Sequence, residues 1–485
     1  MKKILVYISV MAVAITACDE RLEKLNTPEK SASEVGAETL FAQGLRESYD
    51  NMVSTSVNEN IFRLYAQYWA QTTYPDESQY NLVTRTIPQT FWTNGYRDVL
   101  IDLKVAQDLL LEEIATTTDA TSIPRLNNQL ACVDLTMCYV YSIMVDTFGD
   151  IPYSEALDPD NLSPKYDDAR DIYDDIIARI NTSIANITVG AGGFSSSQDQ
   201  VYGGDMSAWM KFANTLKLRM GMRLADVDPS ASVSIVNSAL SGGVFTSNAD
   251  NASIAYSSSP NENPIYTSLV LSGRADYVAA NTVTDKMNSL NDPRRYVFFR
   301  ENLGADTFTG GTYGTANAYA TSTQIGDLFH TSDLDGTIIN YAEVQFLLAE
   351  AAARGGYSTS MTAEEYYNAG ITASFDQWGV DDVATYLAQP EVAYTTADGG
   401  SGDFREVIGT QMWLALYNQG FEGWTTWRRL DMDVLNVPDG LTYEDIPVRF
   451  IYPLEEAQLN GDAVAAAASK IGGDVVQTKI FWDAF

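Results

Sequence analysis

The thiol of Cys18 is the side chain whose position most clearly predicts a chemical modification. It follows a start with Lys2 and Lys3, an apolar run over residues 4–14, and the small residue Ala17. This order is typical of an export signal, and the apolar run is shorter than the about 20 residues that a membrane-spanning helix needs. We expect cleavage before Cys18 and lipid on its sulfur. An ordinary secretory signal that ends in Ala-Cys is the alternative.

Side chains that commonly carry out catalysis are scarce or lack a pattern. His330 is the single histidine, so a zinc site built from several His or Cys ligands is excluded. The sequence contains no G-x-S-x-G elbow, P-loop or G-x-G-x-x-G motif. Asp146 and Asp150 could form a carboxylate pair of the glycosidase type, but capping and solvation at a helix exit explain them better. We therefore expect no enzymatic activity.

One short segment spaces its acidic residues as calcium-binding loops do. Asp333-Leu334-Asp335-Gly336 lacks the third acidic position and the closing Glu of an EF-hand. A turn containing Asp and Gly is the better interpretation. We expect no metal and no cofactor, with a structural calcium ion at this turn as the alternative.

The balance of charge is strongly acidic, with 30 Lys and Arg against 64 Asp and Glu and a net charge of −34. Because a phosphate backbone demands clustered cations, nucleic acid is excluded as a partner. The content of 45% hydrophobic and 11% aromatic residues provides material for a large core. Cys132 and Cys138 lie about 9 Å apart along one predicted helix, too far for a disulfide, and are expected to be buried thiols.

Aromatic side chains within polar loops are the best candidates for ligand binding. Residues 74–81 resemble an exposed loop between two helices, and the Ser-, Asn- and Gly-rich region 230–335 contains further rings. Loops of this composition are typical of adaptable recognition surfaces. The alternative for each ring is that it attaches a loop to the body. The predicted ligand-binding residues are Trp69, Tyr74, Tyr80, Trp92, Tyr266, Tyr277, Tyr313 and Tyr319.

Helices must position these loops, since apolar residues recur at spacings of three and four along much of the chain. The predicted helices are 37–53, 60–73, 90–114, 125–148, 167–187, 207–225, 338–354, 363–378 and 404–418. The fold class predicted is mainly α, with paired helices, a loop-rich insertion at about 230–335 and a tail, 481–485, docked on the body. The predicted organisation is a signal peptide (1–17), a lipidated tether (18–34) and one binding domain (35–485). No second apolar stretch of membrane length is expected.

Seven motifs in order along the chain, together with the signal at Cys18, resemble the SusD/RagB family of nutrient-binding surface lipoproteins, most closely its SusD-like branch. The motifs are residues 65–71 (YAQYWAQ), 148–153 (FGDIPY), 209–219 (WMKFANTLKLR), 292–294 (DPR), 341–351 (YAEVQFLLAEA), 420–424 (GFEGW) before Arg428 and Arg429, and 447–453 (PVRFIYP).

The resemblance implies a body of tetratricopeptide-like helix pairs with a loop-rich lobe and no catalysis. It also implies a lipid anchor in the outer membrane, facing the cell exterior, and a SusC/RagA-like TonB-dependent transporter as partner. Asp19 and Glu20 resemble a surface-export signal. The leading hypothesis is capture of oligosaccharides for uptake. A peptide carrier, a surface glycoside hydrolase and a purely structural tether are the alternatives.

Overall fold

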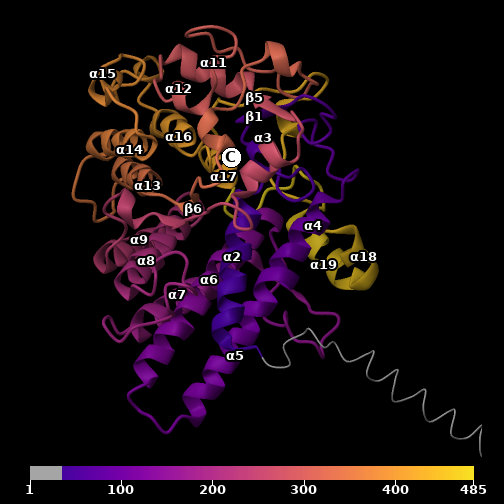
Figure 1. The fold of residues 1–485 in the computed structure, drawn as a ribbon, viewed down its shortest axis with the longest axis vertical. Coiled ribbons are helices and arrows are strands. Elements are labelled where there is room, and N and C mark those ends of the chain that lie inside the picture. The colour runs from indigo at the N-terminus through magenta and orange to yellow at the C-terminus, as the bar shows by residue number, and fades with distance from the viewer. Residues whose placement is uncertain (1–34) are drawn as a thin grey trace, which may run out of the picture. The chain divides into compact units, whose positions relative to one another are not determined.

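The computed structural model describes residues 35–485, so Cys18 and the predicted signal peptide and tether lie outside the described residues. Residues Ala37–Phe485 form one compact unit, in which helices predominate (Figure 1). About 53% of residues 35–485 are helical. The prediction of a mainly α fold is therefore confirmed.

The long helices pack against their neighbours along the chain. They are α2 (Ala37–Val53), α5 (Ile101–Thr116), α6 (Ile123–Phe148), α7 (Ala169–Asn186), α8 (Met206–Arg223), α9 (Pro229–Gly242), α13 (Tyr341–Arg354), α14 (Ala363–Trp378), α16 (Phe404–Ala415) and α17 (Gly420–Leu430). The main contacts join α5 to α6, α6 to α7, α8 to α9 and α13 to α14 (Figure 1). This pairing of neighbours is what the sequence analysis predicted.

Side-chain caps determine where several of these helices begin. The Asp168 carboxylate accepts a hydrogen bond from the backbone N–H of Arg170 at 2.8 Å, at the start of α7. Thr362 and Glu365 form a reciprocal capping box at the start of α14. That helix ends at Gly379, whose φ of 64° favours glycine. These local signals explain why the predicted bounds of α14 agree with the structure.

Helix α6 lies at the centre of the core. Over an 18-residue window it has a mean hydropathy of 1.3 and is long enough to cross a membrane, but 89% of that window is buried inside the protein. The expectation that no further apolar stretch of membrane length exists is therefore wrong, and burial identifies α6 as a core helix. Cys132 and Cys138 on this helix are buried free thiols, which confirms that prediction.

The predicted helix over residues 60–73 is wrong. This segment forms the short helix α3 (Phe62–Tyr65) and then the strand β1 (Trp69–Gln71). Strand β1 pairs antiparallel with β5 (Tyr277–Ala279), with Gln71 opposite Tyr277. A partner about 200 residues away in the sequence therefore outweighs the helical spacing of apolar residues within the segment.

Short elements fill the remaining regions, including much of the predicted insertion at 230–335. The helical ones are α4 (Ile87–Thr93), η1 (Asn94–Leu100), η2 (Asn248–Asp250), α10 (Pro264–Tyr266), η3 (Thr267–Leu271), α11 (Asn281–Ser289), α12 (Arg295–Phe298), η4 (Tyr319–Thr321), η5 (Asp327–His330), α15 (Val383–Leu387), η6 (Asp398–Gly400), η7 (Tyr443–Asp445), α18 (Leu454–Leu459) and α19 (Gly461–Ile471). The other strands are β2 (Ile151–Pro152), β3 (Tyr166–Asp167), β4 (Ala252–Ile254) and β6 (Gly336–Ile339), which form the antiparallel pairs β2–β3 and β4–β6. The insertion is less irregular than predicted, because α9 occupies its start.

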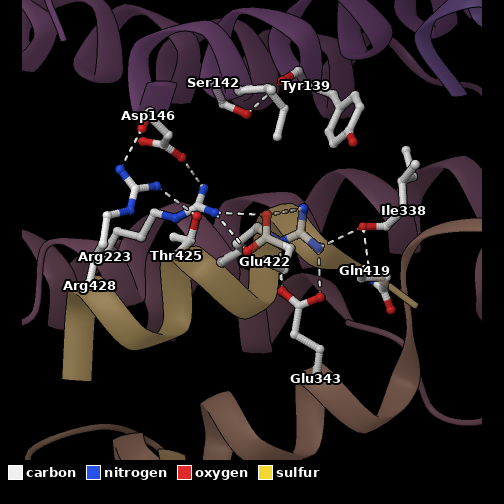
Figure 2. Close-up of polar contacts among 12 residues, drawn as sticks. Tyr139, Ser142, Asp146, Arg223, Ile338, Glu343, Gln419, Glu422, Thr425 and Arg428 are labelled. Carbon is white, nitrogen blue, oxygen red and sulfur yellow. Dashed lines mark hydrogen bonds and ion pairs between the residues drawn. The ribbon is translucent and has the colours of Figure 1, made fainter. Parts of the chain in front are cut away.

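A network of buried charges joins four of the helices (Figure 2). Arg219 on α8 contacts Glu343 on α13 through two nitrogen–oxygen distances of 2.6 Å. Arg223, one turn later on α8, lies 2.5 Å from the Asp146 carboxylate on α6 and 2.8 Å from that of Glu422 on α17. All five side chains are almost fully buried.

The chain ends docked on this network, as the sequence analysis predicted. The Trp482 indole is 1% exposed, and its Nε1–H donates to the Asp146 carboxylate at 2.7 Å. Asp483 beside it is 8% exposed, and neither of its carboxylate oxygens has a hydrogen-bond partner among the described residues.

Stability should respond to pH through Asp483. Burial raises the pKa of its carboxyl to about 6, above the ordinary value of about 3.9. The folded state thus binds this proton more tightly than the unfolded chain, and the resulting stabilisation, present below about pH 4, is lost as the pH rises to about 6. The loss amounts to about 3 kcal/mol. We expect Asp483→Asn to raise the free energy of unfolding at pH 7 relative to the parent.

The measurement is denaturant unfolding of both proteins between pH 4 and 8, with the exposed Asp439→Asn as control. The difference between Asp483→Asn and the parent should grow between pH 4 and 6. A difference that stays constant over this range would contradict the assignment.

Candidate ligand-binding site

A cleft of about 300 Å³ brings together an exposed aromatic ring, two arginines and several hydroxyls. We call it the Tyr74 cleft. It lies where the end of α2, strand β1, the following loop, η3 and the start of β5 meet. Its lining residues are Thr55, Ser56, Val57, Asn58, Gln71, Thr73, Tyr74, Arg85, Ser268, Ser272, Arg274, Asp276 and Tyr277.

Pairing of β1 with β5 creates the floor of the cleft. Gln71 and Tyr277 lie opposite each other, and the Thr72 N–H extends the pairing by donating to the Asp276 carbonyl at 2.9 Å. The Tyr277 hydroxyl donates to the Thr55 carbonyl at 2.6 Å. Burial raises the pKa of Tyr277, so the phenol keeps its proton and this link to the end of α2 persists across the physiological pH range.

The Gln71 side chain holds the loop that carries Tyr74. Its Nε2 donates to the Tyr74 carbonyl at 3.0 Å and to the Glu77 carboxylate at 2.5 Å. Its Oε1 accepts from the Ser78 N–H at 3.1 Å. Tyr74 has a φ of 52°, in the left-handed region that costs a non-glycine residue about 1 kcal/mol. The hydrogen bonds to Gln71 offset that cost and fix the loop.

Two ion pairs set the charge of the cleft. Arg85 Nε lies 2.5 Å from the carboxylate of the fully buried Glu77, while the Arg85 side chain remains 30% exposed. Arg274 Nε lies 2.6 Å from the Asp276 carboxylate, and both side chains are open to solvent. The cleft therefore presents oriented guanidinium donors beside an exposed phenol ring.

The chemistry of this arrangement suits binding. Guanidinium, amide and hydroxyl groups can hydrogen-bond a polyol, and a tyrosine ring can pack against an apolar ring face. In residues 35–485, no group of three or more His, Cys, Asp or Glu is placed to hold a metal ion. The prediction that Asp146 is solvated at a helix exit is wrong, because its fully buried carboxylate lies in the charge network, where it pairs with Arg223.

The structure brings some of the predicted aromatic residues to this cleft. Tyr74 is 63% exposed and Tyr277 lies in the floor. Tyr266 is half-buried at the end of α10, directly before η3. Tyr80 and Tyr319 are half-buried and pack against a small apolar cluster that contains Tyr313. Their role in binding stays a prediction.

Besides Tyr277, which is 6% exposed in β5, three predicted residues do not lie on exposed loops. Trp69, Trp92 and Tyr313 are 1%, 6% and 3% exposed. The Trp69 indole N–H donates to the Tyr417 hydroxyl at 3.1 Å, and the Trp92 ring packs edge-on to Phe148 at 5.0 Å. The expectation of exposure is corrected because strand pairing and helix packing cover these rings.

Sequence reasoning missed the two arginines of the cleft. Only 30 of the 485 residues are Lys or Arg, so a basic residue close to an aromatic one in a polar loop is itself a signal. Arg274 stands three positions before Tyr277 and Arg85 follows Tyr80 by five. The pairing of β1 with β5, which brings these two segments together, is not visible in the local pattern.

Comparison with known proteins shows where this architecture recurs. A family model named SusD-like_2, described as starch-binding and associating with the outer membrane, matches residues 28–453. No curated protein matches the chain. Among solved structures, 73 chains match.

Three of these structures illustrate the similarity. A chitin-binding protein is 25% identical, with a TM-score of 0.76 over 92% of this chain and 99% of its own. A chitin-binding SusD homologue from Flavobacterium johnsoniae is 24% identical, with a TM-score of 0.76 over 92% and 98%. A SusD homologue from Bacteroides thetaiotaomicron is 22% identical, with a TM-score of 0.77 over 93% and 99%. These likenesses confirm the predicted fold of tetratricopeptide-like helix pairs.

Stability measurements should separate packing rings from the exposed ring. Trp69→Ala removes a buried indole and should lower the free energy of unfolding by about 3 to 5 kcal/mol. Tyr74→Ala removes an exposed ring and should change it by no more than about 0.5 kcal/mol. Urea unfolding of both variants beside the parent provides the measurement. A small effect of Trp69→Ala would mean that this ring is not part of the core.

Proposed function

The chain belongs to the SusD-like family of starch-binding proteins that associate with the outer membrane, and from this membership we propose that it binds glycan fragments in the Tyr74 cleft. We further propose that it delivers them to a SusC/RagA-like TonB-dependent transporter for uptake. In this role it captures and releases its ligand without chemical change.

The single observation that carries the choice of site is the exposed ring of Tyr74 beside two oriented arginines. Sugar rings offer an apolar face for stacking and a rim of hydroxyls for hydrogen bonds. Tyr74 can supply the first contact, while Arg85 and Arg274 can supply the second. Because Gln71 already orders the loop, binding does not have to bear the full entropic cost of ordering it.

Known similarities support a glycan as ligand. Two of the similar structures are those of chitin-binding proteins, and the family model is described as starch-binding. The acidic composition alone would suit cationic peptides, but the carboxylates of Glu77 and Asp276 at the cleft are already paired with its two arginines and leave no net negative charge to attract a cationic ligand. We therefore propose an oligosaccharide in preference to a peptide.

Location at the outer face of the outer membrane is part of the same proposal. The family description supports association with that membrane, and the sequence around Cys18 supports a lipid anchor. Several acyl chains on one cysteine would hold the protein stably, which one chain does not. A net charge of −34 would keep the body soluble at the surface.

Calorimetry against malto- and chito-oligosaccharides should detect binding by the parent protein. An aromatic contact contributes about 0.5 to 1.5 kcal/mol, so Tyr74→Ala should weaken affinity by about 2- to 12-fold. Tyr296→Ala, an exposed tyrosine that does not line the cleft, is the matched control and should bind as the parent does. Binding of a peptide digest, with no oligosaccharide bound, would contradict the glycan proposal.

Fractionation of cells tests the anchor. Cys18→Ala removes the sulfur to which the lipid attaches, so the protein should move from the membrane fraction to the soluble fraction. Thr27→Ala, in the predicted tether, keeps both the sulfur and the Asp19-Glu20 segment and serves as control for expression and export. Tight membrane association of Cys18→Ala would refute lipid anchoring at this residue.

A further inference from the structure

A second and larger cleft, of about 740 Å³, lies at the C-terminal ends of α14 and α16. We call it the Trp378 cleft. Its other walls come from the β4–β6 sheet and from the loop that follows η5. Its lining residues are Val201, Asn248, Ala249, Asn251, Ser253, Leu328, Thr331, Asp333, Leu334, Asp335, Thr337, Asp376, Gln377, Trp378, Ala415, Asn418 and Gln419.

This cleft is distinct from the Tyr74 cleft, with which it shares no lining residue. The side chain of Arg63, which is 3% exposed, lies between them. Its Nη2 donates to the Asn418 carbonyl at 2.9 Å, on the side of the Trp378 cleft. Its Nη1 donates to the carbonyls of Val53 and Ser54 at 3.0 Å, directly before Thr55 of the Tyr74 cleft. A ligand in one cleft is therefore separate from a ligand in the other.

Three side chains that line the Trp378 cleft leave a buried polar atom unpaired. The Asn248 amide is held by its Nδ2, which donates to the Ala373 carbonyl at 2.9 Å, and its Oδ1 has no partner within the described chain. The same is true of Gln377 Oε1 and Trp378 Nε1. Each buried polar group that lacks a hydrogen bond lowers the stability of the fold by about 1 to 3 kcal/mol. These three atoms are covered by protein at the cleft wall, so the hydroxyls of a ligand would reach them only after the side chains turn.

The Trp378 indole supplies a rigid aromatic wall. Its ring packs edge-on to Phe298 at 5.3 Å and tilted against Phe329 at 5.8 Å. These contacts set the orientation of the ring, although Trp378 still borders the cleft. An indole combined with amide and carboxylate groups can bind both the apolar face and the hydroxyl rim of a sugar.

The Trp378 cleft is acidic, whereas both arginines of the Tyr74 cleft are paired with carboxylates. Asp333, Asp335 and Asp376 line it, and its described lining contains no Lys or Arg. Two long helices, α14 and α16, also end here, and helix C-termini carry partial negative charge. An anionic sugar would meet repulsion without any compensating cation.

We propose that the Trp378 cleft is a second saccharide-binding site, which takes an uncharged or amine-bearing sugar unit and excludes anionic sugars. Only the choice of a saccharide as the ligand rests on the proposed glycan function. The site itself rests on the cavity, its amide and carboxylate lining and its indole wall.

The test uses NMR to observe the indole N–H of Trp378 in a protein that contains residues 35–485. The indole resonance is assigned by its loss in Trp378→Phe, and the parent is titrated with malto-oligosaccharides, chito-oligosaccharides, glucosamine and oligogalacturonides. We expect at least one uncharged or amine-bearing sugar to shift this resonance, with no shift from oligogalacturonides. The shift should persist in Tyr74→Ala, because the two clefts are separate.

Variants at the exposed rim measure the contribution of the acidic side chains. Asp376→Ala should weaken the affinity read at the indole resonance by about 5-fold, as expected for loss of one hydrogen bond. The exposed Asp462→Ala, outside both clefts, should leave it unchanged. Equal effects of the two variants would overturn the assignment of the site.

The outcomes distinguish this proposal from the proposed function. If calorimetry detects binding that depends on Tyr74 but the Trp378 resonance does not shift, the proposal for the Trp378 cleft is contradicted. The proposal for the Tyr74 cleft is then supported. A shift at Trp378 with no binding dependent on Tyr74 supports the second site and overturns the first. A shift that disappears in Tyr74→Ala, a shift produced by oligogalacturonides, or no response to any sugar overturns the second site.

Discussion

Arg219 and Arg223 make a set of buried ion pairs on which the packing of the helices depends. From one face of α8 they reach carboxylates on α6, α13 and α17 (Figure 2). Transfer of such charges from water into the core is unfavourable. Removal of one partner leaves an uncompensated buried charge, which lowers the free energy of unfolding by about 3 to 5 kcal/mol. Apolar side chains tolerate changes of partner more readily than buried charges do. Helices that must align these charges cannot shift without separating them, so the network specifies one register for α6, α8, α13 and α17.

This register is transmitted to the Tyr74 cleft through α16 and α17. The Trp413 indole on α16 donates to the Ala66 carbonyl at 2.9 Å, and the Tyr68 hydroxyl donates to the Trp413 carbonyl at 2.6 Å. Gly423 on α17 lies so close to the Tyr68 ring that a side chain there would collide with it. Residues 66–68 lead directly into β1, so α16 and α17, which are more than 300 residues away in the sequence, help to determine where β1 pairs with β5 and where Tyr74 projects.

The sequence predicted those parts of the structure whose causes are local. The bounds of α2 and α14 agree with the structure, since apolar spacing and, for α14, a capping box act within a few residues. Local spacing could not predict the strand within residues 60–73, because Trp69 lies in β1 and pairs with Ala279 of β5. The same limit applies to the site. A tyrosine in a polar segment is equally compatible with exposure, as at Tyr74, and with burial, as at Tyr313; only the tertiary fold distinguishes them.

Arg63 shows how the wall between the two clefts remains firm without a buried carboxylate as partner. Its guanidinium is bound to the carbonyls of Val53, Ser54 and Asn418 and to the Asn418 side chain. Burial lowers the pKa of Arg63 to about 10, which still leaves the group charged at neutral pH. The carbonyls at the end of α2 and just beyond α16 carry the partial negative charge that helix C-termini concentrate, and they therefore stabilise this cation. Because one side chain joins both helix ends, movement of either wall would break hydrogen bonds to a buried charge. The wall is thus expected to resist deformation when a ligand occupies one side.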